Sequence, residues 1–122
     1  MVTTSAKAAG VRAGDEDRLF AALANATRRE VLTLLRERGP QPVQALSDHF
    51  EMRRPSLSEH LKVLREAGLV SEERHGRQRI YRLEAAPLAD VQDWLHPYER
   101  FWRAKLQGLG ELLDRMPDDE QP

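Results

Sequence analysis

Apolar residues recur every three or four positions through the first half of the chain, a pattern that predicts amphipathic helices. Leu57, Leu61 and Leu64 show it most clearly, since the polar residues between them fall on the other sides of a helix. Gly68 follows this segment directly and favours the end of a helix. Four helices are expected, over residues 15–24, from Asn25 as an N-cap to residue 39, over 42–50 and over 55–67.

The period then changes to that of β-strands. Two short apolar segments, the second starting at Ile80, flank a polar stretch centred on Gly76. This predicts a β-hairpin whose tip needs a positive φ at Gly76. Strand alternation is expected to place Arg77 and Arg79 on one face, with Ile80 pointing inward and Arg74 across the turn.

A helical period returns after Pro87, and its apolar residues form one long stripe. A small domain cannot bury such a stripe alone, so we interpret it, together with the first helix, as a homodimer interface. A ligand pocket built from its aromatic residues is the alternative. Pro97 removes one helical hydrogen bond, so a kink or a break is expected there. The predicted dimerisation residues are Leu19, Leu88, Val91, Trp94, Leu95, Tyr98, Trp102, Leu106, Leu109 and Leu113.

The composition of the 122 residues, 40% hydrophobic and 32% charged, is typical of a globular domain. The chain has no cysteine, which excludes disulfides and thiolate zinc sites. It has neither a signal-peptide core nor an apolar run approaching the roughly 18 residues of a membrane span, so a cytoplasmic location is expected. One domain over residues 15–116 is predicted, with disordered tails over 1–14 and 117–122.

Charge is unevenly distributed along the chain. The net charge is −1, yet residues 53–82 hold eight Lys or Arg against four Glu. Two short helices joined by a tight turn and followed by a basic hairpin predict a mainly α fold, the winged helix-turn-helix. The second helix of such a pair can enter the major groove of double-stranded DNA, and the hairpin can reach the backbone beside it.

Residues 19–29, 55–70 and 76–83 resemble, in turn, the opening motif, the recognition helix and the wing of ArsR-type regulators. The resemblance covers about residues 15–115. It implies a homodimeric winged-helix repressor that binds DNA and is released by a metal or another inducer. Residues 94–102 also resemble a branch without a recognised metal site. The resemblance assigns DNA contacts to Arg54, Ser56, Ser58 and His60 in the helix and to Arg77 and Arg79 in the wing. The charge pattern adds Arg53, Lys62 and Arg74.

Arg53 departs from the family pattern, which has Ser or Thr at this position as the cap of the recognition helix. An arginine side chain cannot accept hydrogen bonds from the N–H groups of the helix, which leaves that end less well capped by ~1 kcal/mol. We hypothesise that a DNA phosphate completes the cap, because phosphates bind favourably at helix N-termini.

No metal, cofactor or catalytic residue is predicted. Asp93, His96 and Glu99 recur at a spacing that could gather metal ligands, but the pairings of the family's zinc sites are absent. We interpret His96 as part of a surface ion pair. The chain has no Gly-rich phosphate loop and no nucleophile motif, so an enzyme is the weaker alternative, as is a protein-binding winged helix. A small-molecule inducer stays open.

Overall fold

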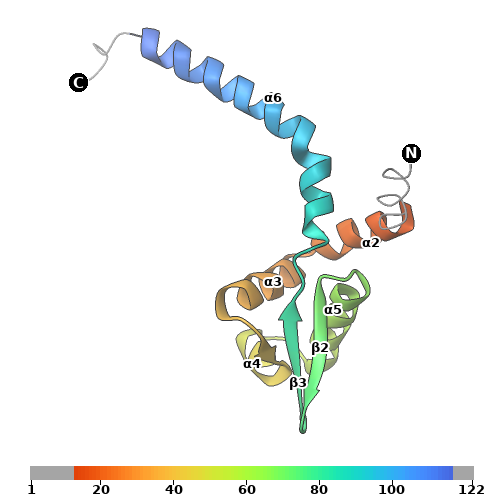
Figure 1. Cartoon of the computed structure of the whole chain (residues 1–122). Coiled ribbons are helices and arrows are strands. Elements are labelled where there is room, and N and C mark those ends of the chain that lie inside the picture. Colours follow the sequence, from red (N-terminus) through yellow and green to blue (C-terminus); the bar gives the residue numbers. More distant parts are fainter. Residues whose placement is uncertain (1–12, 117–122) are drawn as a thin grey trace, which may run out of the picture. The chain divides into compact units, whose positions relative to one another are not determined.

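The computed structural model describes residues 13–116 (Figure 1). These residues form helices and one small antiparallel sheet. The elements are α2 (Ala13–Leu23), α3 (Ala26–Arg38), β1 (Gln41–Pro42), α4 (Val43–His49), α5 (Arg54–Glu66), β2 (Val70–His75), β3 (Gln78–Leu83) and α6 (Leu88–Arg115). The chain divides between Asp90 and Val91 into two compact units.

Helix α2 begins two residues before the expected start, so residues 13 and 14 are helical. The remainder of the predicted tails, residues 1–12 and 117–122, lies outside the described residues. Asn25 caps α3 as predicted, since its Oδ1 accepts a hydrogen bond from the backbone N–H of Arg28 at 3.0 Å. Gly39 ends α3 with φ 78°.

The core of the first unit lies between α3, α5 and the sheet. Leu57, Leu61 and Leu64 are each 1% exposed or less, so the predicted apolar face of α5 is confirmed. Burying one such leucine contributes about 2 kcal/mol, and together these three fix which face of α5 turns outward. Gly68 (φ 79°) ends this segment, and the backbone N–H of Leu69 donates a hydrogen bond to the Leu64 carbonyl at 2.9 Å.

The sheet has three strands in the order β1-β3-β2, whereas the sequence predicted a two-stranded hairpin. Strand β1 has only two residues, too few to show a period of two. Gly76 takes φ 63° in the turn, as expected. The expectation that Ile80 points inward is wrong. Tyr81 is 2% exposed and opposes Glu72, while Ile80 opposes Glu73 on the outer face.

Helix α6 forms most of the second unit and has 28 residues. It continues through Pro97, so of the two expected outcomes the break is wrong. Figure 1 shows that α6 bends along its length, which is the behaviour expected of a proline inside a helix. Among the helices of the described chain, none has the length and apolar character needed to cross a membrane.

Candidate nucleic-acid interface

Helices α4 and α5 form the helix-turn-helix, and the outward side of α5 carries the predicted DNA-contacting residues. Its buried leucines hold this side toward solvent. His60 is half-buried and differs from the others. The exposed members of the predicted set on or next to α5 are Arg53, Arg54, Ser56, Ser58 and Lys62.

Arg53 is the N-cap of α5, and its side chain makes no capping hydrogen bond. Its backbone has the extended conformation usual for an N-cap, with φ −72° and ψ 149°. The N–H groups of Ser56 and Leu57 both donate to the Arg53 carbonyl, at 3.0 and 3.2 Å. Pro55, in the first turn, has no N–H to offer. The start of α5 therefore lacks a side-chain cap and has a cation beside it.

The wing consists of β2, β3 and the turn at Gly76, and its tip extends past the ends of α4 and α5 (Figure 1). Arg74 lies across the turn from Arg79, as predicted, and the register places the two directly opposite each other. Residues that oppose each other point to the same face, so both share the face of buried Tyr81. The two arginines extend the inner face of the sheet beyond the core.

Between the wing and the start of α5 lies a cavity of about 500 Å³, which we name the wing hollow. It brings together five of the predicted DNA-contacting residues, from positions up to 25 residues apart in the chain (54 to 79). No carboxylate lines it. The lining residues are Pro42, Val43, Gln44, Arg54, Ser58, Arg74, Arg77, Gln78 and Arg79. Ser56, Lys62 and Arg53 are not among them.

Charged neighbours hold part of the wing. Arg79 lies 3.5 Å from Glu72, which also pairs with Arg65 at 3.3 Å. Within residues 13–116, Arg74 and Arg77 form no ion pair. The tip of the wing therefore carries positive charge that the described protein does not neutralise.

Gln44 of α4 orients Arg54, a role that the sequence did not reveal. The Nε2 of Gln44 donates to Asp48 Oδ1 at 2.9 Å, which leaves its Oε1 as an acceptor. Arg54 donates from Nη2 to this oxygen at 3.2 Å. Gln44 and Arg54 both line the wing hollow, so this contact sets the position of Arg54 there. Gln44 and Arg54 are ten positions apart in the chain, and no helical or strand periodicity links them.

His60 does not line the wing hollow but contacts Arg28 of α3. Arg28 donates to the Ala21 and Ala22 carbonyls at 2.8 Å each, and its Nη1 lies 3.2 Å from His60 Nδ1. A guanidinium has no acceptor, so Nδ1 accepts and the ring proton sits on Nε2. Burial and the nearby Arg28 charge lower the pKa of His60, while Glu59 partly opposes them.

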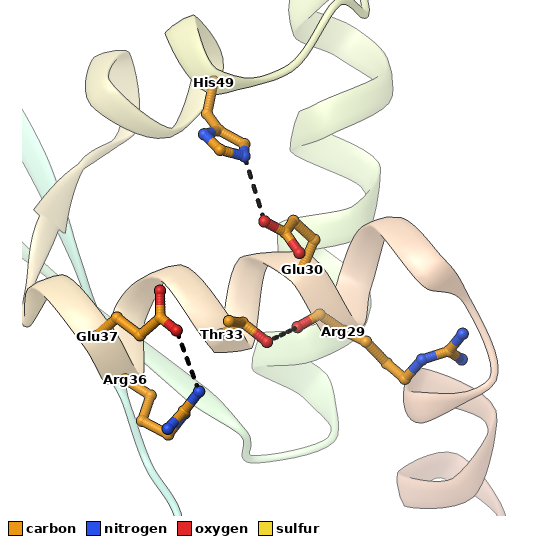
Figure 2. Close-up of polar contacts among 6 residues, drawn as sticks. All are labelled: Arg29, Glu30, Thr33, Arg36, Glu37 and His49. Carbon is orange, nitrogen blue, oxygen red and sulfur yellow. Dashed lines mark hydrogen bonds and ion pairs between the residues drawn. The ribbon is translucent and has the colours of Figure 1, made fainter.

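Helices α3 and α4 are joined by an ion pair. Figure 2 shows His49, at the end of α4, pointing toward Glu30 of α3, with His49 Nε2 3.2 Å from a Glu30 carboxylate oxygen. Thr33 donates to the Arg29 carbonyl at 3.0 Å on the same helix. This contact positions the first helix of the pair, and neither His49 nor Glu30 lines the wing hollow.

The apolar stripe of α6 is exposed over most of its length. Trp102 is 49% exposed, Leu106 is 66% exposed, and α6 has no buried residue. Trp94, Tyr98, Leu109 and Leu113 are also exposed, while Leu88, Val91 and Leu95 are half-buried. Leu19 differs, since it is 3% exposed and buried in its own protomer, which leaves little of its surface for a partner.

His96 Nδ1 lies 3.7 Å from Glu99, the ion pair that the sequence suggested. Among the residues that the structure describes, no three potential metal ligands come together. The assignment of no metal site stays a prediction.

Comparison with known proteins places these features in a family. Residues 25–72 match the model for bacterial regulatory proteins of the arsR family. The chain is 39% identical to the HTH-type transcriptional regulator Rv2034 of Mycobacterium tuberculosis, over 84% of this chain and 92% of that protein. It is 34% identical to the transcriptional repressor SdpR of Bacillus subtilis, over 63% of this chain and 84% of that one.

Solved structures agree with the sequence comparison. A crystal structure of an ArsR family transcriptional regulator has a TM-score of 0.66 and 34% identity, covering 74% of this chain and 92% of that one. A solution structure from Mycobacterium bovis, described as a homodimeric winged helix-turn-helix DNA-binding domain, has a TM-score of 0.58 and 28% identity. It covers 71% of this chain and 80% of that one.

Proposed function

The chain belongs to the ArsR family of bacterial regulatory proteins and is a winged helix-turn-helix transcriptional regulator, and we propose that it represses transcription by binding an inverted-repeat operator as a homodimer. The observation that carries this proposal is the wing hollow, where cationic side chains of α5 and of the wing converge without a carboxylate. Phosphate contacts dominate the affinity of proteins for DNA, and a basic surface of which only Arg79 has an ion pair within the described chain supplies them.

The two elements have separate roles in this proposal. Helix α5 enters the major groove, where Ser56 and Lys62 on its exposed side face base edges and phosphates. The wing lies along the adjacent backbone. His60 donates from Nε2, because Arg28 occupies its Nδ1. Arg53 binds a phosphate beside the uncapped start of α5.

The exposed stripe of α6 supports the homodimer. Large apolar patches on a soluble protein mark contact surfaces, and dimer interfaces are rich in aromatic residues. Pairing two copies through this stripe would hold two α5 helices about 34 Å apart, one turn of DNA. A repressor follows if such a site overlaps a promoter, and the relative SdpR is named a repressor.

We assign no catalytic residue, cofactor or metal to the chain. Its family consists of transcriptional regulators. The proposed action on DNA implies a cytoplasmic location. An inducer would act by changing the separation of the two α5 helices, which lowers DNA affinity without contact to the DNA. A small molecule that binds the dimer fits this role.

The test is a selection of DNA fragments from the source genome by the purified protein, followed by sequencing of the bound fragments. We expect an enriched inverted repeat that is bound as two copies of the 14.0 kDa chain, with an affinity that falls steeply as salt rises. Chelator is expected to leave the binding unchanged. Absence of an enriched sequence, together with salt-independent capture of a protein partner, would instead support a protein-binding winged helix.

A further inference from the structure

The wing hollow joins side chains that the sequence assigned to different tasks. The helix that carries Arg54 was expected to enter the major groove, and the wing was expected to reach the DNA backbone. The structure places Arg54 and Ser58 of α5 around the same cavity as Arg74, Arg77 and Arg79. We propose that the wing hollow seats one backbone phosphate of the bound DNA, contacted jointly by Arg54 from α5 and by Arg74 and Arg79 from the wing. This assignment rests on the proposed function.

The register of the wing supports an anion as the occupant. Arg74 and Arg79 oppose each other directly on one face of the hairpin. Like charges in this position destabilise a strand pair, so the arrangement costs stability in the free protein. Glu72 offsets part of that cost through its 3.5 Å ion pair with Arg79, but Arg74 has no ion pair within the described chain. A phosphate between the two arginines removes the repulsion.

The chemistry of the lining distinguishes a phosphate from a base edge. A guanine offers two acceptor atoms in the major groove, enough for one arginine. Four arginines line the wing hollow, and no carboxylate is among the lining residues, although Glu72 pairs with Arg79 from outside it. A phosphate carries a full negative charge and two free oxygens, each able to accept from more than one guanidinium group. The hydroxyl of Ser58 adds a further donor at the same cavity.

Arg54 is held in this position before DNA binds. Its Nη2 donates to Gln44 Oε1, and Asp48 fixes the orientation of the Gln44 amide. The other N–H groups of the guanidinium stay available for a ligand. Gln44 is therefore a positioning residue, and it also lines the wing hollow. The cavity of about 500 Å³ is open enough to admit a stretch of backbone around the phosphate.

The first test is a double-mutant cycle with Arg54→Gln and Arg79→Gln on a duplex obtained by the genomic selection. Each single variant is expected to bind about tenfold more weakly. If both arginines hold one phosphate, the loss of DNA affinity in the double variant is clearly smaller than the product of the losses in the two single variants. The slope of log affinity against log salt concentration then falls by no more than about one. The control pairs Arg79→Gln with Lys62→Gln, which lies outside the wing hollow, and there the two factors multiply.

The decisive test neutralises single phosphates of that duplex as methylphosphonates, one position at a time. One position in each half-site is expected to weaken binding of the wild-type protein. On that same DNA, Arg54→Gln and Arg79→Gln should cause no further loss, whereas Lys62→Gln still does. Arg54→Gln should also weaken selected and scrambled duplexes by the same factor, because a phosphate contact carries no sequence information.

Other outcomes overturn the assignment. The two variants could instead respond to different phosphates, or Arg54→Gln could lose DNA affinity on the selected sequence alone. Either result would show that Arg54 reads a base and that Arg79 holds the backbone separately. These side chains are exposed, so the variants are expected to fold, which thermal unfolding checks. A wild-type protein that binds no duplex would contradict the proposed function itself, a result distinct from DNA binding with multiplicative losses.

Discussion

Replacing Arg53 with serine is expected to stabilise the fold and weaken DNA binding. The backbone at Arg53 already has N-cap geometry, so serine needs no rearrangement. Pro55 has no N–H, and the Ser56 N–H already donates to the Arg53 carbonyl at 3.0 Å, so the new hydroxyl shares a donor. The gain from the cap is therefore at the low end, about 0.5 kcal/mol. Removing a cation from the positive end of the helix dipole adds about 0.5 kcal/mol.

Urea unfolding at a fixed protein concentration measures the first effect, since the stability of a dimer depends on concentration. We expect the free energy of unfolding of Arg53→Ser to rise by about 1 kcal/mol. DNA affinity is expected to fall and the salt slope to decrease by about one, because a phosphate contact is lost. The matched control is Arg36→Ser on the exposed side of α3, which should leave affinity unchanged. Unchanged DNA affinity of Arg53→Ser would refute the phosphate cap.

Four further predictions concern parts of the molecule away from the wing hollow. Arg28→Gln should raise the pKa of His60 toward its ordinary value of about 6.5, measured by NMR titration, and an unchanged pKa would contradict the contact. Because the folded protein lowers this pKa, wild-type stability should decline as pH falls below about 6.5, and the decline should be smaller in Arg28→Gln. Leu106→Glu should convert the dimer to a monomer in light scattering and abolish tight DNA binding, whereas Gln107→Glu, off the apolar stripe, should do neither. Leu61→Ala should lower the free energy of unfolding by about 3 kcal/mol, because Leu61 is 1% exposed.

Local signals in the sequence were sufficient for the helices and turns. The Asn25 cap and the turn at Gly76 follow from backbone rules that need no tertiary information. The buried face of α5 follows from its leucine spacing. Strand β1 could not be predicted, because two residues next to a proline show no period.

The register of β2 and β3 decides which side chains of the wing face inward. The alternation of residues within one strand does not determine that register. A shift of one residue exchanges every side chain between the faces, and pairing with Glu72 places Tyr81 inside instead of Ile80. The contacts of Arg28 with His60 and of Arg54 with Gln44 join residues 32 and 10 positions apart. Such pairs arise from packing, so only the structure revealed them.

In the proposed function, two copies of the chain place two α5 helices in successive major grooves of one operator. Hydroxyl-radical footprinting of the wild-type protein on the selected duplex tests it most directly. We expect two protected segments on one face of the DNA, about 34 Å apart and related by the symmetry of the inverted repeat. A single protected segment without symmetry, bound by one chain, would contradict it.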